Sequence, residues 1–288
     1  MILQVIMSGI AIGAIYALLA LGIVLIFKTT LVLNFAHGEV AMLTTLFAYS
    51  IIVSLGFPYW VGVIGALVLG GILGILSDLL VRPLLNAPLL SMVGLTIAMF
   101  FVIHAIGGIF WGYQTWPFPN PFPEKAVDLG GLVVSPIHLF IIFVLLVLGG
   151  VLFAVLNFTT VGTAFRATCQ DRRAALLMGI SSNRVFAISW AAGCALGAIS
   201  GILIAPIIHV QVNMMVVILL KAFAAAVLGG ILSLPGAIVG GVVLGVVENI
   251  FSFYCGTEFQ DSIAFLIIIL VLLVRPQGIL GSPVEIKV

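Results

Sequence analysis

Long uninterrupted runs of apolar residues constrain this sequence more than any other feature. About nine such runs separate consecutive charges or turn-forming clusters, at residues 3–27, 40–55, 59–80, 89–111, 137–157, 185–208, 216–232, 236–254 and 262–274. A helix needs about 20 apolar residues to cross the hydrocarbon of a bilayer, and only a helix satisfies its own backbone hydrogen bonds there. We therefore predict an all-α integral membrane protein, a polytopic bundle of about 8–9 transmembrane helices forming one domain over residues 1–288. The second, seventh and ninth runs are short for a full crossing, so breaks or re-entrant segments are expected at 31–39 and 216–235.

Composition agrees with lipid as the solvent and narrows the possible functions. Hydrophobic residues make up 64% of the chain and charged residues 7%, against about a quarter charged in soluble domains. The formal net charge of +1 leaves no dense basic face for nucleic acid. The sequence has no P-loop, H-E-x-x-H, G-x-S-x-G or C-x-x-C motif, and its four histidines form no i, i+4 pair. We therefore expect a transporter or channel that is not an enzyme and that holds no metal or cofactor of its own.

The distribution of charge predicts the orientation. Basic residues gather at alternate span ends, and cytoplasmic loops carry the excess of Lys and Arg. The residues on this side are Lys28, Arg82, Arg166, Arg172, Arg173, Arg184, Arg275 and Lys287. The opposite side receives Glu124, Lys125, Asp128, Glu258 and Asp261. The N-terminus is then outside and the C-terminus in the cytoplasm. Because no basic residue precedes the first run, that run is expected to remain as a span.

The outer loop 112–135 contains the stretch WPFPNPFP at residues 116–123. Alternating prolines prevent a helix and favour a stiff, extended segment. Two interpretations fit, a rigid surface loop anchored by its aromatic residues or a docking site for a partner on the outer face. Glycines at four-residue spacing, such as Gly9 and Gly13 or Gly70 and Gly74, predict close contact between helices.

The cluster Asn34-Phe35-Ala36-His37-Gly38-Glu39 lies between the first two runs. Polar side chains near hydrocarbon are costly, so these residues are expected to face protein, water or the cytoplasm. One interpretation is a cytoplasmic turn in which Glu39 benefits from the dipole at the start of the next helix. The other is a broken helix whose backbone lines a transport path, with Asn34, His37, Gly38 and Glu39 as its candidates.

The inner loop 159–184 is rich in Ala, Leu and Arg, which are good helix formers. We predict a short helix outside the membrane over residues 164–178, with Thr160 as a candidate N-cap and Gly179 at its C-terminal end. This segment is either a solvated basic loop or the arm through which a soluble motor moves the bundle. Its candidate contact residues are Arg166, Asp171, Arg172, Arg173 and Gly179.

Lys221 and Glu248 are charged residues within apolar runs, at similar predicted depths. Neighbouring antiparallel spans would bring them together as a buried ion pair, and contact with a passing zwitterion is the alternative. Gly229 and Gly230 follow Lys221 and complete the candidates for the translocation path.

Three of these segments resemble hallmarks of the branched-chain amino-acid ABC permeases of the LivH type. The segments are NFAHGE at 34–39, GTAFRATCQDRRAALLMGI at 162–180 and KAFAAAVLGG at 221–230, followed by SLPGA at 233–237 and RPQG at 275–278. Leu232 departs from the pattern, since the family usually has a glycine there.

The resemblance implies an ABC importer permease fold and alternating access in the bacterial inner membrane. It also implies partners: cytoplasmic ATPase subunits that bind ATP, a second homologous permease in a heterodimer, and an outer binding protein that delivers leucine, isoleucine or valine. The segment 159–184 would then be the coupling segment seated on an ATPase. Two rivals remain, import of urea, short amides or another small polar solute by the same architecture, and an ion-coupled secondary carrier using Glu39 or Glu248.

Overall fold

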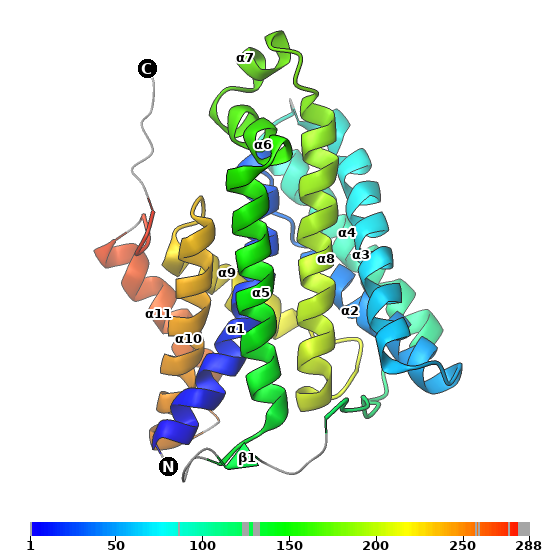
Figure 1. The fold of residues 1–288 in the computed structure, drawn as a ribbon, viewed down its shortest axis with the longest axis vertical. Coiled ribbons are helices and arrows are strands. Elements are labelled where there is room, and N and C mark those ends of the chain that lie inside the picture. The colour runs from blue at the N-terminus through cyan, green and yellow to red at the C-terminus, as the bar shows by residue number, and fades with distance from the viewer. Residues whose placement is uncertain are drawn as a thin grey trace. The chain divides into compact units, whose positions relative to one another are not determined.

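The structure is a computed structural model that describes residues 2–85, 87–122, 127–128, 133–256, 258, 260–275 and 277–281. Figure 1 labels the helices α1–α11 and the strand β1, and the complete set of elements follows in chain order. They are α1 (Ile2–Thr30), α2 (His37–Tyr49), the π-helical turn η1 (Ser50–Ser54), α3 (Tyr59–Val81), the 3₁₀ turn η2 (Arg82–Leu84), α4 (Leu89–Trp111), β1 (Val127–Asp128), β2 (Val133–Val134), α5 (Pro136–Phe158), α6 (Thr160–Gln170), α7 (Arg172–Leu177), α8 (Ser182–Ile208), α9 (Val216–Gly229), α10 (Leu234–Cys255) and α11 (Gln260–Val274).

All nine predicted runs form helices, which confirms the helical membrane fold. Within the described residues, seven helices are long and apolar enough to cross a membrane, so the predicted count of about 8–9 is approximate. One of the seven is His37–Ser54, in which α2 continues into η1. The two shorter apolar helices are α9, with 14 residues, and α11, with 15, as expected from the short seventh and ninth runs.

The contacts divide the chain into two compact units, and each is assembled from separated stretches of sequence. Unit 1 comprises the described residues within 1–24, 120–145 and 217–288, and unit 2 comprises those within 25–119 and 146–216. The boundary passes through α1 and α5. The predicted single domain over residues 1–288 therefore stays a prediction.

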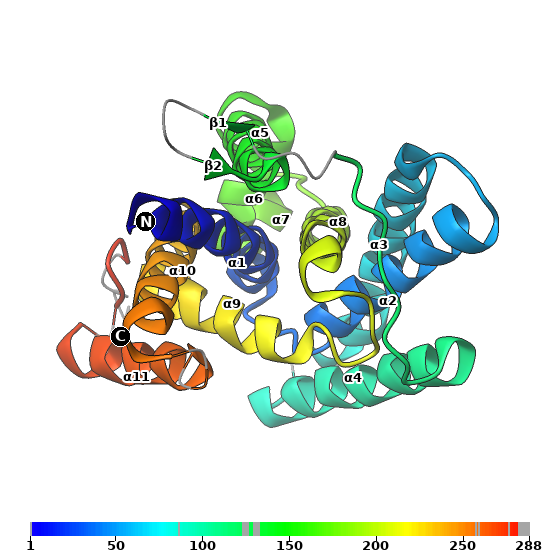
Figure 2. The same cartoon turned by 90° about the horizontal axis from the view of Figure 1, so that it is seen from below.

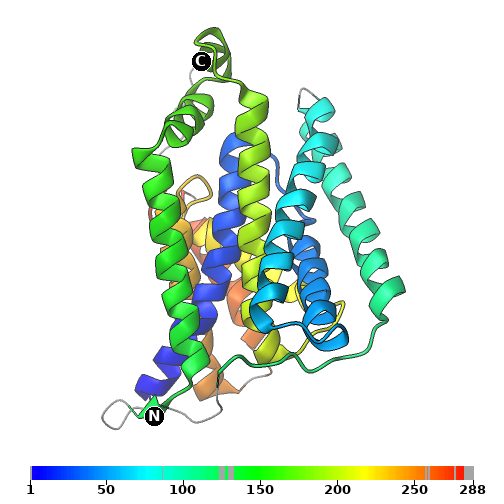
Figure 3. The ribbon, with the colours of Figure 1, turned by 45° about the vertical axis from the view of Figure 1, so that its right-hand side comes forward.

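Unit 2 is built on the contact between α3 and α8, which lie side by side in Figures 1 and 3. Gly70 faces Cys194 and Ala198, and Gly74 faces the backbone of Trp190. Because glycine has no side chain, the two backbones approach closely enough for van der Waals contact, which is the main attraction between helices in lipid. The core of unit 2 includes Ile26, Val32, Ala36, Val40, Leu43, Val81, Met92, Met99, Ile103, Trp190 and Cys194.

Unit 1 has the same kind of close backbone contact at glycines, between α1 and α10, which are neighbours in Figure 2. Gly13 of α1 lies against the backbone of Gly241 and Val242, and Gly245 of α10 lies against that of Gly13. Near the start of α1, the Asn249 side-chain amide donates hydrogen bonds of 2.6 Å to the Val5 carbonyl and the Ser8 hydroxyl. Both glycine patterns therefore form close helix contacts, as the sequence predicts.

The described part of the loop 112–135 is extended, as its prolines predict. The Trp116 N–H donates to the Val210 carbonyl at 2.8 Å, and the Val210 N–H donates back to the Trp116 carbonyl at 2.9 Å. The Trp116 ring lies 6.2 Å from that of Tyr49, and the Phe118 ring lies 6.1 Å from that of Tyr59. This half of the loop is therefore fixed to unit 2. Glu124 and Lys125 lie outside the described residues.

The contact between α3 and α8 gives a first prediction, with its control in the same helix. A Cβ atom at Gly74 would lie 2.8 Å from the Trp190 carbonyl carbon and 2.9 Å from the Ala191 Cα atom, whereas one at Gly71 would meet nothing within 4 Å. We expect Gly74→Ala to lower the free energy of unfolding by about 1–3 kcal/mol through overpacking. Gly71→Ala should leave it unchanged or raise it slightly. Unfolding in detergent measures both, and equal effects would contradict the packing argument.

Candidate functional site

The predicted coupling segment is two helices, so the single helix predicted over 164–178 is wrong. The helix is interrupted at Asp171, whose carboxylate Oδ1 accepts hydrogen bonds from the N–H groups of Arg173 at 2.8 Å and Ala174 at 3.1 Å. A short acidic side chain competes well for the free N–H groups of a new helix, so it ends α6 and caps α7. The N-cap of α6 is Thr159, whose hydroxyl accepts from the Gly162 N–H, and Thr160 is the first helical residue.

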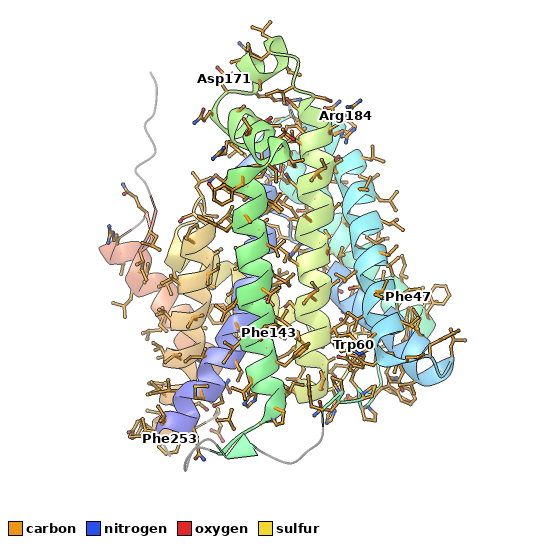
Figure 4. The ribbon with its side chains drawn as sticks, viewed as in Figure 1. Phe47, Trp60, Phe143, Asp171, Arg184 and Phe253 are labelled. Carbon is orange, nitrogen blue, oxygen red and sulfur yellow. The ribbon has the colours of Figure 1, made fainter. Side chains whose placement is uncertain are left out.

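The end of α7 agrees with the sequence. Gly179 has a φ of +82°, and its N–H donates to the Leu176 carbonyl at 3.0 Å. A left-handed glycine is the common way to end a helix, so this predicted C-terminal position is confirmed. The chain then enters α8, and Figure 4 shows Asp171 and Arg184 at this end of unit 2.

The predicted contact residues of the segment have different surroundings. The guanidinium carbon of Arg172 lies 5.1 Å above the centre of the Phe186 ring, which joins α7 to the first turns of α8. Arg166 is exposed and reaches the Asn157 side-chain oxygen at 3.4 Å. Arg173 is also exposed, one helical turn before Leu177. The exposed fractions of Leu177 and of the following Met178 are 89% and 82%. The tip of α7 therefore presents apolar and basic side chains together.

The chemistry of the segment includes neither a reactive thiol nor a metal site. Burial raises the pKa of the Cys169 thiol to about 11, and the nearby charge of Lys28 opposes this only in part. The thiol therefore stays protonated at neutral pH, as expected for a small apolar filler. Among the described residues, no three His, Cys, Asp or Glu side chains are close enough together to hold a metal ion.

The cluster at 34–39 forms a tight turn between α1 and α2. The helix α1 ends at Thr30, and the next residue, Leu31, has a φ of +56°. The buried side-chain oxygen of Asn34 accepts a hydrogen bond from the Ala36 N–H at 3.1 Å, and α2 begins at His37. From α4, the Thr96 hydroxyl donates to the Leu33 carbonyl at 3.1 Å. This break in the helix agrees with both interpretations of the sequence.

Glu39 lies in the first turn of α2, and its partner is on another helix. Its Oε2 atom is 3.0 Å from Nδ1 of His104, a residue of α4, and the Glu39 side chain is 1% exposed. The His104 ring stacks on Phe100 with its centre 5.8 Å away and is tilted against Tyr113. The contact joins α2 to α4.

The sequence analysis did not predict His104 as a partner of Glu39, although a single histidine within an apolar run is a visible signal. Gly38 and His37 are buried beside Glu39 in the same turn.

Lys221 and Glu248 form the ion pair that the sequence predicts. The ammonium Nζ of Lys221 donates to Oε1 of Glu248 at 2.5 Å, and 7% and 1% of the two side chains are exposed. The same Nζ lies 5.7 Å from the centre of the Tyr16 ring. The pair therefore links α9, α10 and α1 within unit 1. The second Glu248 oxygen, Oε2, is buried and has no hydrogen-bond partner among the residues that the structure describes.

Gly229 and Gly230 lie at the turn between α9 and α10. A Cβ atom at Gly229 would collide with the Gly236 carbonyl, and Gly230 has a φ of +108°. The N–H groups of Ile279 and Leu280 donate to the carbonyls of Leu228 and Gly229 at 2.8 and 3.0 Å. These bonds satisfy the free carbonyls at the end of α9. Close packing therefore accounts for both glycines, and a role in the translocation path stays a prediction.

A third charged pair was not predicted. Arg82 at the end of α3 contacts the Asp78 Oδ2 atom at 2.5 Å, and the same nitrogen donates to the backbone carbonyl of Asn183 in α8 at 2.9 Å. The Asp78 side chain is only 2% exposed. The i, i+4 spacing of Asp78 and Arg82 was a signal in the sequence, although it could not indicate the contact with Asn183.

Comparison with known proteins gives consistent matches over nearly the whole chain. Residues 5–272 match the family described as branched-chain amino acid transport system, permease component. The chain is 32% identical over 304 residues to the high-affinity branched-chain amino acid transport system permease protein LivH of Escherichia coli, covering 99% of this chain and 97% of LivH. It is also 32% identical to the corresponding protein BraD of Pseudomonas aeruginosa, covering 99% of this chain and 98% of BraD.

A solved structure supports the fold. PsaBC from Streptococcus pneumoniae, determined in complex with Fab, matches with a TM-score of 0.52, covering 95% of this chain and 91% of that one. The sequence identity is 14%, so this likeness concerns the arrangement of helices alone.

The Lys221–Glu248 pair gives a second prediction. Removing one partner leaves an uncompensated charge inside the protein, so Lys221→Met should destabilise the fold by about 3–5 kcal/mol. Removing both in Lys221→Met with Glu248→Leu should recover most of that stability, because apolar replacement of a whole pair is often neutral. The yield and unfolding midpoint of purified protein measure the two variants. A double variant as unstable as the single one would show that the pair does not account for the cost.

Proposed function

The chain belongs to the family of branched-chain amino acid transport permease components, and from this we propose that it is the membrane-spanning subunit of an ATP-driven importer for leucine, isoleucine and valine. The match along nearly the full length of chains named for this transport carries the proposal. The seven helices of spanning length in the described part fit a multi-pass permease.

ATP is bound and hydrolysed by separate cytoplasmic subunits, since this sequence has no P-loop. The coupling segment of α6 and α7 docks on one of them. This docking is supported by the tip of α7, where the side chains of Arg173, Leu177 and Met178 are all exposed. Exposed apolar side chains rimmed by charge are typical of protein interfaces. Arg166, Asp171 and Gly179 are the other candidate contact residues of the segment.

Transport proceeds by alternating access between outward-open and inward-open states. ATP-driven closure of the ATPase subunits moves the coupling segment, and the protein must contact its partners differently in the two states for this to have an effect. The path candidates are Asn34, His37, Gly38 and Glu39 at the break before α2, and Lys221, Gly229, Gly230 and Glu248 in unit 1.

The complete importer also contains a second homologous permease as a heterodimer and an outer-face binding protein that selects the substrate. The chain lies in the bacterial inner membrane with its N-terminus outside and its C-terminus in the cytoplasm. The basic residues of the coupling segment and of the α3 end support this orientation, because cytoplasmic ends carry the excess of Lys and Arg.

Uptake of labelled leucine tests the substrate class. Cells that express the whole operon with and without this chain are compared, with unlabelled isoleucine, valine, urea and acetamide as competitors. We expect deletion to abolish uptake and only the branched-chain amino acids to compete. Leucine uptake that ignores the deletion would contradict the substrate, and uptake that persists without ATPase subunits but collapses with an uncoupler would indicate an ion-coupled carrier.

Charge reversal tests the coupling segment. Arg172→Glu with Arg173→Glu should abolish uptake while the protein stays in the membrane, because repulsion would replace attraction at the docking surface. Lysine at both positions should retain most uptake. Arg275→Glu, at an exposed basic residue beyond α11, is the control and should retain uptake. Normal uptake by the double glutamate variant would contradict the assignment.

A further inference from the structure

The ion pair at the cytoplasmic end of α3 has a feature that a simple salt bridge lacks. One guanidinium nitrogen of Arg82 contacts both the carboxylate of Asp78, on its own helix, and the Asn183 carbonyl, on α8. The Asp78 side chain is 2% exposed and that of Arg82 is 26% exposed. A buried carboxylate one turn away therefore fixes the direction of the arginine, and the arginine is bonded to backbone rather than to a mobile side chain.

The carbonyl that Arg82 contacts belongs to the joint where the coupling segment enters α8. Asn183 lies in the first turn of α8, four residues after Gly179 ends α7. Arg172 of α7 stacks on Phe186 in the same first turns of α8, at 5.1 Å. Two contacts thus converge on one turn of α8, one from the coupling segment and one from α3.

Below this joint, α3 and α8 cannot slide easily past each other. Gly70 and Gly74 set the α3 backbone directly against that of α8. Close-packed helix interfaces change between discrete arrangements rather than deforming continuously. A displacement applied to α7 therefore reaches α3 by two contacts, this close packing and the Arg82–Asn183 hydrogen bond, and the hydrogen bond is the one at the turn where the coupling segment enters α8.

We propose that Arg82, oriented by Asp78, is a positioning residue for energy coupling: it holds α3 to the first turn of α8, so that the coupling segment, α8 and α3 move as one rigid body. The proposal rests on the proposed function, because it assumes an ATPase that moves the coupling segment. It adds a residue pair outside that segment, on a helix that does not adjoin it in sequence.

The first test measures rigidity directly in the assembled transporter. Spin labels replace Leu79, exposed on α3, and Gln170, exposed on α6, in a chain whose three cysteines are changed to alanine. We expect the distance between labels to change by less than about 2 Å between the ATP-free and ATP-bound complexes. A change of about one helical turn, ~5 Å, would overturn the proposal. Leucine uptake by the labelled complex is the control that it still cycles.

The second test measures coupling in membrane vesicles that contain the complete transporter. Asp78→Leu with Arg82→Met removes both charges together, so no buried charge is left unpaired, and no donor reaches Asn183. We expect substrate transported per ATP hydrolysed to fall about fivefold or more, the usual lower range of coupling between sites. Arg82→Lys keeps a donor and should retain the wild-type ratio. Arg275→Gln removes an exposed basic residue and is the control.

The outcomes separate this proposal from the proposed function. A wild-type complex that takes up no branched-chain amino acid would overturn the function. A wild-type complex that transports leucine, with an apolar double variant of unchanged substrate-to-ATP ratio, would overturn the positioning role alone. If the double variant does not accumulate in the membrane, a spin-label distance that changes in the otherwise native chain still overturns the rigid-body movement on which the proposal depends.

Discussion

Direct contact between helix backbones is the constraint on which both units depend. Lipid gives no hydrophobic drive to bring apolar helices together, so attraction comes from close packing where side chains are smallest. Gly74 on α3 meets Trp190 on α8, and Gly13 on α1 meets Gly241 on α10. Such contacts fix the axial register of each helix pair. The charged groups can then be aligned to within hydrogen-bond distance, as Arg82 and Asn183 are.

The buried charges follow from this register. Each costs free energy in a low-dielectric interior unless a partner compensates it. Lys221 is paired with Glu248 between α9 and α10, and the buried Glu39 carboxyl group contacts the His104 ring between α2 and α4. Each of these contacts joins helices that glycine contacts or tight turns have already brought together. The pairs therefore add little net stability to an arrangement that packing already fixes, although breaking one partner is costly, whereas replacing both is often neutral.

Much of this architecture could be predicted from the sequence, because apolar run length and glycine spacing report helices and their contacts directly. The pairing of Lys221 with Glu248 could also be predicted, since two charges at similar depth in adjacent spans have few other partners. The break at Asp171 could not, because helix propensity favours continuity and the capping geometry depends on where the chain turns. His104 and the contact of Arg82 with Asn183 were missed because they join residues 65 and 101 positions apart. No local pattern encodes such separations.

A permease driven from the cytoplasm needs a segment that is exposed to its motor and yet firmly joined to the bundle. Different side chains have to meet the two requirements. Under the proposed function, the short helix α7, which begins at the Asp171 cap, carries side chains of both kinds. Leu177 and Met178 are exposed at its tip, while Arg172 turns back onto Phe186. Force received at the tip would then enter α8 at its first turn, where Arg82 connects it to α3.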